Sequence, residues 1–173
     1  MFDELKIIPW PDPRLKKASA PVERFDADLN ALATRMIELM RANAGVGLAA
    51  PQVGLNIRLF VANPTGEPGD DAVYVNPVLD LPDGTEDGEE GCLSLPGIRA
   101  RIDRSLAVRI RAKDADGNPV EKTASGLEAR IWQHEIDHLD GVLILDRMGP
   151  VAKMAARKTL RELEEKYAGK REK

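Results

Sequence analysis

Both histidines of this chain lie within one five-residue segment whose spacing suits a metal site. His134, Glu135 and His138 fit the pattern His-Glu-x-x-His. In a helix, residues four apart lie on the same face, so the two imidazoles can reach one metal ion. Glu135 projects about 100° round that helix, close enough to act on a water molecule bound to the ion. The segment therefore favours metal-dependent hydrolysis, with Glu135 as the general acid and base.

A third ligand has to come from elsewhere, because a catalytic site of this kind usually has three protein ligands and one open position. Cys92, the only cysteine, is one candidate, since a thiolate is a strong ligand for soft and borderline metals. A lone cysteine is, however, more often a small buried apolar residue. Three glutamates follow the motif at a spacing that suits a zinc endopeptidase, although their segment of alternating charge is typical of a solvated helix: Glu162, Glu164 and Glu165. The residues alone leave the choice open.

A helix over residues 126–141 has to position the metal motif. Ser125 is a candidate N-cap, and Glu128 three residues later completes the pattern of a capping box. Gly141 suits the position just after a helix ends, because glycine adopts the left-handed conformation there without strain. The motif is therefore expected in the middle of a helix with defined ends.

Two further helices and an N-terminal arm are expected outside the motif helix. Apolar residues at helical spacing indicate a helix over 26–43, with Asp26 or Asp28 as its N-cap. A third helix is expected to begin near Pro150 and to run over 150–167. Four prolines in the first 24 residues indicate an extended arm on the surface.

Strands are expected between the first helix and the motif helix. A Gly-rich turn should occupy residues 45–54, and an acidic, turn-rich loop should occupy residues 83–91. The segments that read as strands are 57–63, 72–82 with a bend at Pro77, 92–102, 106–111 and 120–124. No crossover helix separates these strands, so the fold class is α+β with a largely antiparallel sheet.

Composition sets limits on the class of protein. The chain has 173 residues, 43% of them hydrophobic and 31% charged, which indicates a single globular domain over residues 1–173. A net charge of −4 disfavours a nucleic-acid-binding domain, and no apolar stretch approaches the roughly 20 residues of a membrane span. A single cysteine excludes an internal disulfide and suits a reducing, cytoplasmic compartment. No signal or transit segment is recognised at the N-terminus, so a bacterial cytoplasm is expected rather than an organelle.

Three segments, in this order, resemble the three motifs of the peptide deformylase family. They are GVGLAAPQVG at 45–54, EGCLSLPG at 90–97 and QHEIDHLDG at 133–141, and the opening PDPRLKKASAPV at 11–22 is also similar. The resemblance spans nearly the whole chain. It implies a compact α+β domain with antiparallel strands packed around the motif helix. It also implies removal of the formyl group from N-formylmethionine at the N-terminus of newly synthesised proteins.

The resemblance also implies a ligand set and a mechanism. Cys92, His134 and His138 would hold one divalent ion, typically Fe²⁺ in the family, with Zn²⁺, Ni²⁺ or Co²⁺ able to take its place. A metal-bound hydroxide would attack the formyl carbon, and Glu135 would pass the proton to the leaving amine. The developing oxyanion would accept hydrogen bonds from the side chain of Gln52 and the backbone N–H of Leu93.

Several weaker assignments concern the substrate and the support of the ligands. Gly47 matches a position whose backbone lines the site, where a missing Cβ permits close approach. Arg99 is similar to an arginine that contacts the peptide backbone of the substrate, and an exposed strand arginine is an equally good interpretation. Glu90 is a candidate to orient a ligand or a nearby arginine.

An apolar pocket is needed for the methionine side chain of the substrate. Val46 and Ile131 are candidates, with Leu127 on the same helical face as Ile131 and the histidines, and ordinary core packing is the alternative for all three. Two residues depart from the family pattern. Ala44 stands where many members carry an acidic residue, which puts a salt bridge near the substrate entrance in doubt, and Leu95 stands where a β-branched residue is frequent.

Two other functions compete with deformylation. One is a zinc endopeptidase with a downstream glutamate ligand, and the other is a ribosome-associated binding module with a structural metal. The presence of both Glu135 and Gln52 favours catalysis over the second of these. The C-terminal helix region, 150–173, is a candidate for ribosome docking, and its glutamates make a solvated helix the alternative. Its basic residues are Lys153, Arg157, Lys158, Arg161, Lys170, Arg171 and Lys173. Neither a membrane nor a specific DNA sequence is expected as a partner.

Overall fold

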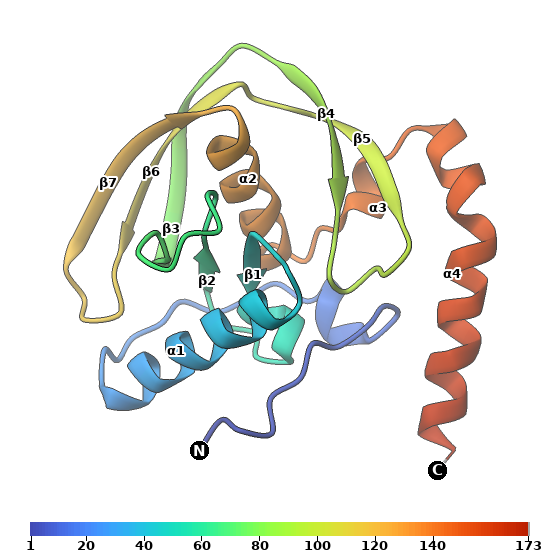
Figure 1. The fold of residues 1–173 in the computed structure, drawn as a ribbon, viewed down its shortest axis with the longest axis horizontal. Helices are drawn as coiled ribbons and strands as arrows, with labels where there is room; N and C mark the ends of the chain where they lie inside the picture. The colour runs from blue at the N-terminus through green and yellow to red at the C-terminus, as the bar shows by residue number, and fades with distance from the viewer. Residues whose placement is uncertain (173) are drawn as a thin grey trace.

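A five-stranded antiparallel sheet and a separate two-stranded sheet form the frame of the molecule (Figure 1). The computed structural model describes residues 1–172, and Lys173 of the basic C-terminal segment lies outside them. The larger sheet has the order β1-β2-β3-β6-β7, and the smaller one pairs β4 with β5. The strands are β1 (Gly47–Ala49), β2 (Leu59–Ala62), β3 (Ala72–Asp83), β4 (Glu86–Gly91), β5 (Arg99–Arg104), β6 (Ala107–Lys113) and β7 (Pro119–Ser125).

Helices flank these sheets and confirm the expected α+β class. α1 near the N-terminus, the motif helix α2 and the C-terminal α4 correspond to the three expected helices, whereas the short α3 was not expected. None of the helices within residues 1–172 is both long and apolar enough to cross a membrane. Their bounds are α1 (Ala27–Ala42), α2 (Leu127–Leu139), α3 (Ile144–Arg147) and α4 (Pro150–Arg171), and two 3-10 turns lie at Pro13–Lys16 and Ala50–Val53.

α1 and α2 pack on opposite faces of the larger sheet. Successive residues of a strand point to opposite faces, so Leu59 and Val61 of β2 join the α1 core while Phe60 joins the α2 core. On the α2 side, Phe60 stacks on Tyr74 with ring centroids 4.9 Å apart, and Tyr74 meets the edge of Trp132 at 5.8 Å. Because Trp132 is fully buried, the motif helix is held firmly against the strands.

Several expected element ends are confirmed. The side chain of Asp26 accepts a hydrogen bond from the backbone N–H of Leu29 at 3.1 Å and so caps α1. The bend expected at Pro77 is present, because the pairing of β3 with β6 shifts register there and Asn76 has a φ of +51°. Gly141 has a φ of +74° just after α2 ends, as a C-terminal stop requires.

The acidic segment 83–91 was expected to be a loop, and this prediction is wrong. Its residues from Glu86 onward form β4, which pairs in register with β5. Arginines of β5 pair with acidic residues of β4: Arg101 with Asp87 and Arg99 with Glu89 diagonally across the strands, and Arg104 with Glu90 four residues along. Opposite charges on neighbouring strands stabilise a sheet. The segment has the composition of a loop, but it forms a strand because arginines of β5 neutralise its acidic side chains.

The expected strand over 92–102 begins only at Arg99. Residues 92–98 form a tight turn, in which the backbone N–H of Leu95 donates to the carbonyl of Cys92 at 2.9 Å. Gly97, with a φ of +81°, ends the turn. The turn is important for function because it carries Cys92.

Two other local predictions are corrected. Ser125 is the last residue of β7, so it does not cap α2, and the N-cap is Gly126 with a φ of +65° and no side-chain hydrogen bond. Glu128 forms an ion pair with Lys122 instead of completing a capping box. The Gly-rich segment 45–54 is not wholly a turn, because it contains β1, which pairs with β2. The other four expected strands are present as β2, β3, β6 and β7, with ends shifted by one or two residues.

Candidate metal centre

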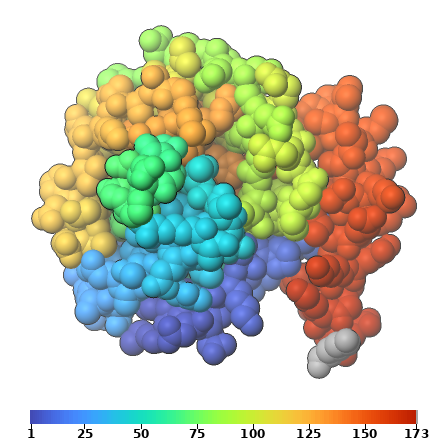
Figure 2. Space-filling model, in the orientation of Figure 1, coloured from blue at the N-terminus to red at the C-terminus, as the bar shows by residue number. Residues whose placement is uncertain are grey.

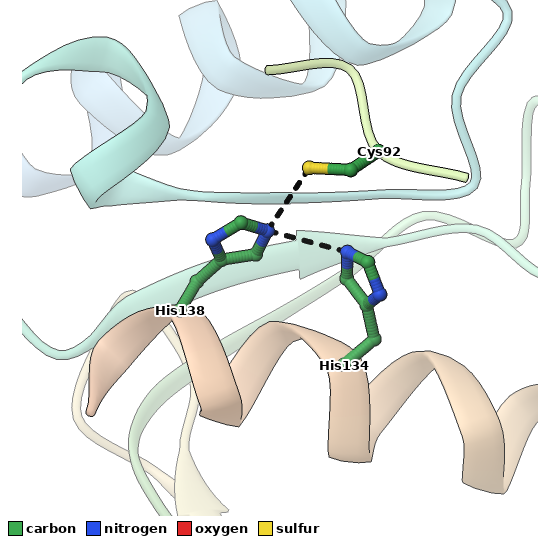
Figure 3. A group of neighbouring side chains, drawn as sticks. All are labelled: Cys92, His134 and His138. Carbon is green, nitrogen blue, oxygen red and sulfur yellow. Dashed lines mark hydrogen bonds between the residues drawn. The ribbon is translucent and has the colours of Figure 1, made fainter. Parts of the chain in front are cut away.

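The structure brings three possible metal ligands together at one point. Cys92 lies in the turn after β4, and His134 and His138 lie on one face of α2, opposite the sulfur (Figure 3). Nε2 of His138 lies 3.3 Å from Sγ of Cys92 and 3.2 Å from Nε2 of His134. One ligand atom from each of the three residues lies within 4.8 Å of the others. The third ligand could have been Cys92 or a glutamate of the C-terminal helix. The fold brings Cys92 to the histidines.

These separations fit a single tetrahedral ion. With metal–nitrogen bonds of about 2.0–2.1 Å and a metal–sulfur bond of about 2.3 Å, tetrahedral angles require about 3.4 Å between nitrogens and about 3.6 Å between nitrogen and sulfur. The observed 3.2 and 3.3 Å differ from these values by only a few tenths of an ångström. A thiolate with two imidazoles also suits a soft or borderline divalent ion. The residues present therefore fit a metal ion.

The glutamates of the endopeptidase interpretation do not join this cluster. Within residues 1–172, the group of ligand atoms comprises Cys92 and the two histidines. All three glutamates are exposed on α4: Glu162, Glu164 and Glu165. The endopeptidase alternative thus finds no third ligand in this fold.

Glu90 orients His134 from behind the metal site. Nδ1 of His134 lies 2.8 Å from Oε1 of Glu90, so the imidazole N–H donates to the carboxylate and Nε2 is left for the metal. Arg104 donates to both oxygens of Glu90, at 2.8 and 2.9 Å, and Arg130 donates to Oε2 at 2.7 Å. Burial alone would raise the pKa of Glu90, but Arg104 and His134 hold this pKa well below its usual range. Glu90 is thus an ionised anchor, in contact with both a ligand and an arginine.

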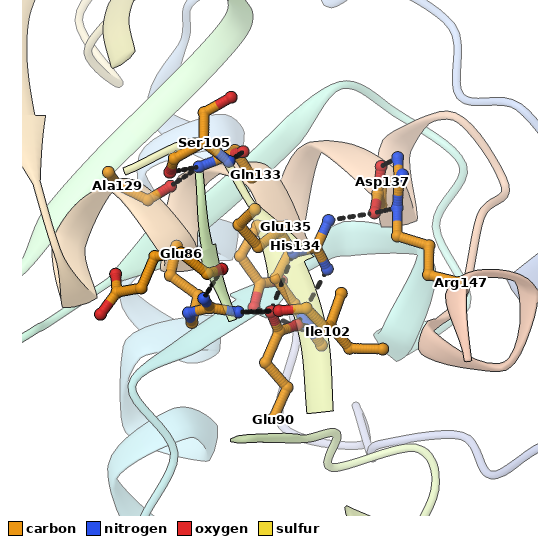
Figure 4. A network of polar contacts seen from close by, with 12 residues as sticks. Glu86, Glu90, Ile102, Ser105, Ala129, Gln133, His134, Glu135, Asp137 and Arg147 are labelled. Carbon is orange, nitrogen blue, oxygen red and sulfur yellow. Dashed lines mark hydrogen bonds and ion pairs between the residues drawn. The ribbon is translucent and has the colours of Figure 1, made fainter. Parts of the chain in front are cut away.

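The same network reaches a residue inside the metal motif itself. Nη1 of Arg104 donates to Oδ2 of Asp137 at 2.6 Å, and Arg147 of α3 donates to both oxygens of Asp137 at 2.5 and 2.7 Å (Figure 4). Arg104 and Asp137 are buried. Four members of the network were not singled out from the sequence: Arg104, Arg130, Asp137 and Arg147. One signal was present, because Arg104 lies in phase with the buried Ala100 and Ile102 along β5.

The two imidazoles differ in their surroundings. Burial lowers the pKa of His134, but hydrogen bonds to Cys92 and Glu90 outweigh it and raise this pKa well above its usual value. Burial and the charge of His134 lower the pKa of His138 well below its usual value. Nδ1 of His138 is buried and has no hydrogen-bond partner in the described part of the chain. His134 is therefore fixed by Glu90, whereas His138 is fixed mainly by packing.

Glu135 lies beside the ligands with one free carboxylate oxygen. Its Oε1 is 4.0 Å from Nε2 of His134, and its buried Oε2 accepts no hydrogen bond from residues 1–172. Burial raises the pKa of Glu135 to about 7. Gly47 of β1 makes this position possible, because a Cβ there would lie 2.5 Å from Oε1 of Glu135. The carboxyl is thus placed for proton transfer near neutral pH.

Gln52 and Leu93 present N–H groups on the thiolate side. The Gln52 side chain is 1% exposed, and its Oε1 accepts from the backbone N–H of Ala49 at 3.0 Å. This bond orients Nε2, which lies 3.3 Å from Oγ of Ser94 and 3.5 Å from Sγ of Cys92. The backbone N–H of Leu93 has no acceptor among the described residues. Both groups therefore can donate to a ligand near the metal site.

A cavity of about 580 Å³ opens in front of these groups. Figure 2 shows the hollow between the cyan segment that follows α1 and the yellow-green β5. Every residue expected to bind substrate lines it: Val46, Gly47, Arg99 and Ile131. Gln52, Leu93, Leu127 and Ala44 line it too.

The lining residues differ in depth. Ile131 is 4% exposed and lies near the floor, whereas Val46 and Leu127 are exposed at the rim. Leu127 was expected on the helical face of Ile131 and the histidines as a candidate for the apolar pocket or the core, but it is 53% exposed and does not pack in the core, since it is the first residue of α2. Arg99 is exposed and forms an ion pair with Glu89. Leu95 is fully buried in the core that β5 shares with α4.

Comparisons with known proteins agree with this site. A family model described as polypeptide deformylase matches residues 4–154. The chain is 47% identical to a peptide deformylase of Rhodopirellula baltica, over 84% of this chain and 73% of that protein. It is 44% identical to the chloroplastic/mitochondrial peptide deformylase 1B of Arabidopsis thaliana, over 96% of this chain and 62% of that protein.

A solved structure shares the fold as well. The peptide deformylase of Plasmodium falciparum superposes with a TM-score of 0.92 at 35% identity, over 95% of this chain and 98% of that chain. The sequence relatives and the structural match agree over nearly the whole chain. This chain belongs to the polypeptide deformylase family.

Proposed function

We propose that this chain is a metal-dependent hydrolase that removes the formyl group from N-formylmethionine at the N-terminus of newly synthesised proteins. Membership of the family supports deformylation of nascent peptides. The observation that carries the proposal is the convergence of Cys92, His134 and His138 beside the buried carboxyl of Glu135. On this proposal, residues 1–173 act as one catalytic domain.

The ion is held by one sulfur and two nitrogens in our proposal. Fe²⁺ is the proposed physiological ion, and Zn²⁺, Ni²⁺ and Co²⁺ suit the same donors. When bound, such an ion lowers the pKa of a coordinated water molecule towards neutrality and polarises a carbonyl group. Glu90 supports this role by holding His134 with Nε2 directed at the other ligands.

Glu135 moves the proton in the proposed reaction. It accepts a proton from the attacking water through Oε1, the oxygen that lies 4.0 Å from Nε2 of His134. It then delivers the proton to the methionine nitrogen as the carbon–nitrogen bond breaks, which yields formate and a free amine. A pKa of about 7 supports both roles, because the carboxyl can accept and return a proton near neutral pH.

Gln52 and Leu93 stabilise the negative charge that develops on the formyl oxygen in this proposal. The amide orientation of Gln52 is set by its bond from Ala49, so its N–H is ready before the substrate arrives. The unpaired N–H of Leu93 supports the same role. Hydrogen-bond donors that are already oriented in a water-poor cavity stabilise such a charge, because they do not have to move during the reaction.

The cavity also supports a proposal for substrate binding. The backbone at Val46 and Gly47 lies along one rim, where a peptide can approach closely. Ile131, with Val46 and Leu127 at the mouth, forms the apolar surface for the methionine side chain. Arg99 on the opposite rim contacts the peptide backbone after leaving its exposed partner Glu89.

Formate release from a formyl-Met tripeptide tests the proposal. Protein prepared without oxygen and loaded with Fe²⁺, Ni²⁺ or Zn²⁺ should turn the peptide over. The variant Glu135→Gln keeps the shape of the side chain and should retain the metal while kcat falls by about 10²- to 10⁴-fold. No turnover by the wild-type protein with any of these ions would refute the proposed function.

Cys92→Ser separates deformylation from the endopeptidase alternative. The deformylase proposal expects metal binding and formate release to be lost or markedly changed, because a hydroxyl replaces the thiolate donor. An endopeptidase with a glutamate ligand would keep both its metal and its activity. Metal content and formate release on the same sample distinguish the two.

Ribosome contact through α4 is a separate proposal. The exposed basic residues of α4, including Arg157 and Arg161, suit phosphate groups of RNA. Arg157→Glu should reduce co-sedimentation with ribosomes, and Arg24→Glu on the N-terminal arm is the matched control. Equal co-sedimentation of both variants would end this proposal.

A bacterial cytoplasmic location is also a proposal. The single cysteine supports a reducing compartment. Similar proteins include one from a bacterium and one named as chloroplastic/mitochondrial. Cell fractionation with an antibody against the chain would test the location.

A further inference from the structure

A second, smaller cavity adjoins the one in front of the metal ligands. It has a volume of about 240 Å³ and shares three lining residues with the larger cavity: Asn43, Leu93 and Pro96. Leu93 directly follows Cys92 in the chain. The two cavities therefore lie side by side with these three residues between them, and a ligand that extends from the metal site past Leu93 can reach the second cavity.

The two sides of the second cavity differ in chemistry. Apart from Asn43, the lining outside α4 is apolar, with Ile7, Pro9, Leu93 and Pro96. The far side is formed by α4, where Lys166 and Lys170 lie one helical turn apart on the same face. No carboxylate lines this cavity, and neither lysine forms an ion pair with a described residue. The far side therefore carries two positive charges that a ligand can neutralise.

The wall formed by α4 is anchored to the turn that carries Cys92. Leu163 packs against the core of β5 and α3, and Cγ2 of Thr159 lies 3.6 Å from the position of a Cβ at Gly97. The N-terminal arm is tied to the same region, because the backbone N–H of Trp10 donates to the carbonyl of Ser94 at 2.9 Å. The second cavity is thus bounded by segments that hold the metal site itself.

We propose that the second cavity binds residues of the formylated peptide downstream of methionine and favours peptides with carboxylate side chains there. This inference rests on the proposed function. An extended peptide advances about 3.3 Å per residue, so each residue after methionine lies farther from the metal site. Both carboxylates that line the larger cavity beside β4 are already paired with arginines, Glu89 with Arg99 and Glu90 with Arg130, whereas Lys166 and Lys170 have no such partner among the described residues. The position next to the larger cavity and the unpaired charges of Lys166 and Lys170 thus select the occupant.

Formylated peptides of two lengths test this inference. A formyl-Met-Ala-Ser tripeptide is compared with hexapeptides that extend it by three glutamates, three serines or three lysines. For the wild-type protein, kcat/KM should be highest for the glutamate hexapeptide and lowest for the lysine hexapeptide. Each exposed ion pair should contribute a factor of about 1.4 to 5, and the difference should shrink at high salt.

Charge reversal on α4 identifies the residues responsible. Lys166→Glu should lower or invert the ratio of kcat/KM between the glutamate and lysine hexapeptides. Lys158→Glu makes the same change of charge on the same helix, at an exposed position that lines no described cavity, and should leave the ratio unchanged. Because the ratio is taken within one protein sample, a partly unfolded variant does not affect it.

The outcomes separate this inference from the function on which it rests. If the wild-type protein does not deformylate the tripeptide, the proposed function itself fails. If it deformylates the tripeptide but treats the three hexapeptides alike, only the second cavity's role is refuted. An equal change of the ratio in Lys158→Glu and Lys166→Glu would likewise overturn it, since the effect would then come from the overall charge.

Discussion

The motif helix α2 and the C-terminal helix α4 are built in contrasting ways. Most of α2 is buried, and it is held by the larger sheet on one side and by the network of Glu90, Arg104 and Asp137 on the other. In the described part of α4, Ala156 is the only buried side chain. The difference indicates that α2 holds its side chains in fixed positions, as the proposed catalysis requires, whereas the exposed face of α4 can tolerate change.

The largest expected effect is on the network that holds α2. Arg104→Met removes the buried guanidinium that bridges Glu90 and Asp137 and leaves each carboxylate with fewer donors, so the free energy of unfolding should fall by up to about 3–5 kcal/mol. Arg101→Met on the same strand removes only the exposed pair with Asp87 and should cost less than about 1 kcal/mol. Urea denaturation measures both, and similar losses would remove the contrast between buried and exposed pairs.

The same truncation of a leucine in each helix compares their packing directly. Leu139→Ala in α2 empties a fully buried position and should lower the free energy of unfolding by about 2–5 kcal/mol. Leu163→Ala in α4 affects a partly buried residue, so we expect a clearly smaller loss, of about 1 kcal/mol. Thermal unfolding followed by circular dichroism would contradict the comparison if the second loss equalled the first.

An added methyl group tests how closely the backbone approaches Glu135. Gly47→Ala places a Cβ 2.5 Å from Oε1 of Glu135, so the carboxyl must move and kcat should fall by about 10²-fold. Gly69→Ala meets no atom within 4 Å and is the matched control. Steady-state formate release measures both, and full activity of Gly47→Ala would show that the position of Glu135 is not critical.

The smallest effect is expected on the exposed face of α4. Met154 is 74% exposed, so Met154→Ser should change the free energy of unfolding by less than about 0.5 kcal/mol. The activity on a formyl-Met tripeptide should not change either. A loss of several kcal/mol would mean that α4 is packed as tightly as α2.

The helices and the metal motif could be predicted from the sequence because their signals are local. Helical spacing and the Asp26 cap define α1, and the positions of the two histidines define the face of α2 that holds a metal. Cys92 could be assigned only through resemblance to a family, because its approach to the histidines depends on how the turn after β4 packs against α2. Cys92 and His138 are 46 residues apart in the chain.

The network behind the metal site could not be predicted for the same reason. The acidic residues of β4 have the composition of a loop, and only the arginines of β5 turn them into a paired strand. Asp137 occupies a variable position of the motif, so nothing in the pattern marks it as the partner of Arg147 from α3. One local signal was present: along β5, Arg104 occupies the same alternating position as the apolar Ala100 and Ile102, which are buried.

Metal titration of formate release tests the central claim most directly. Protein freed of metal by a chelator should regain activity on a formyl-Met tripeptide as Ni²⁺ is added, in proportion to the bound ion, up to one ion per chain. Cys92→Ser should bind the ion weakly and regain little activity. Activity that persists in the metal-free protein, or full recovery in Cys92→Ser, would contradict a metal centre formed by Cys92, His134 and His138.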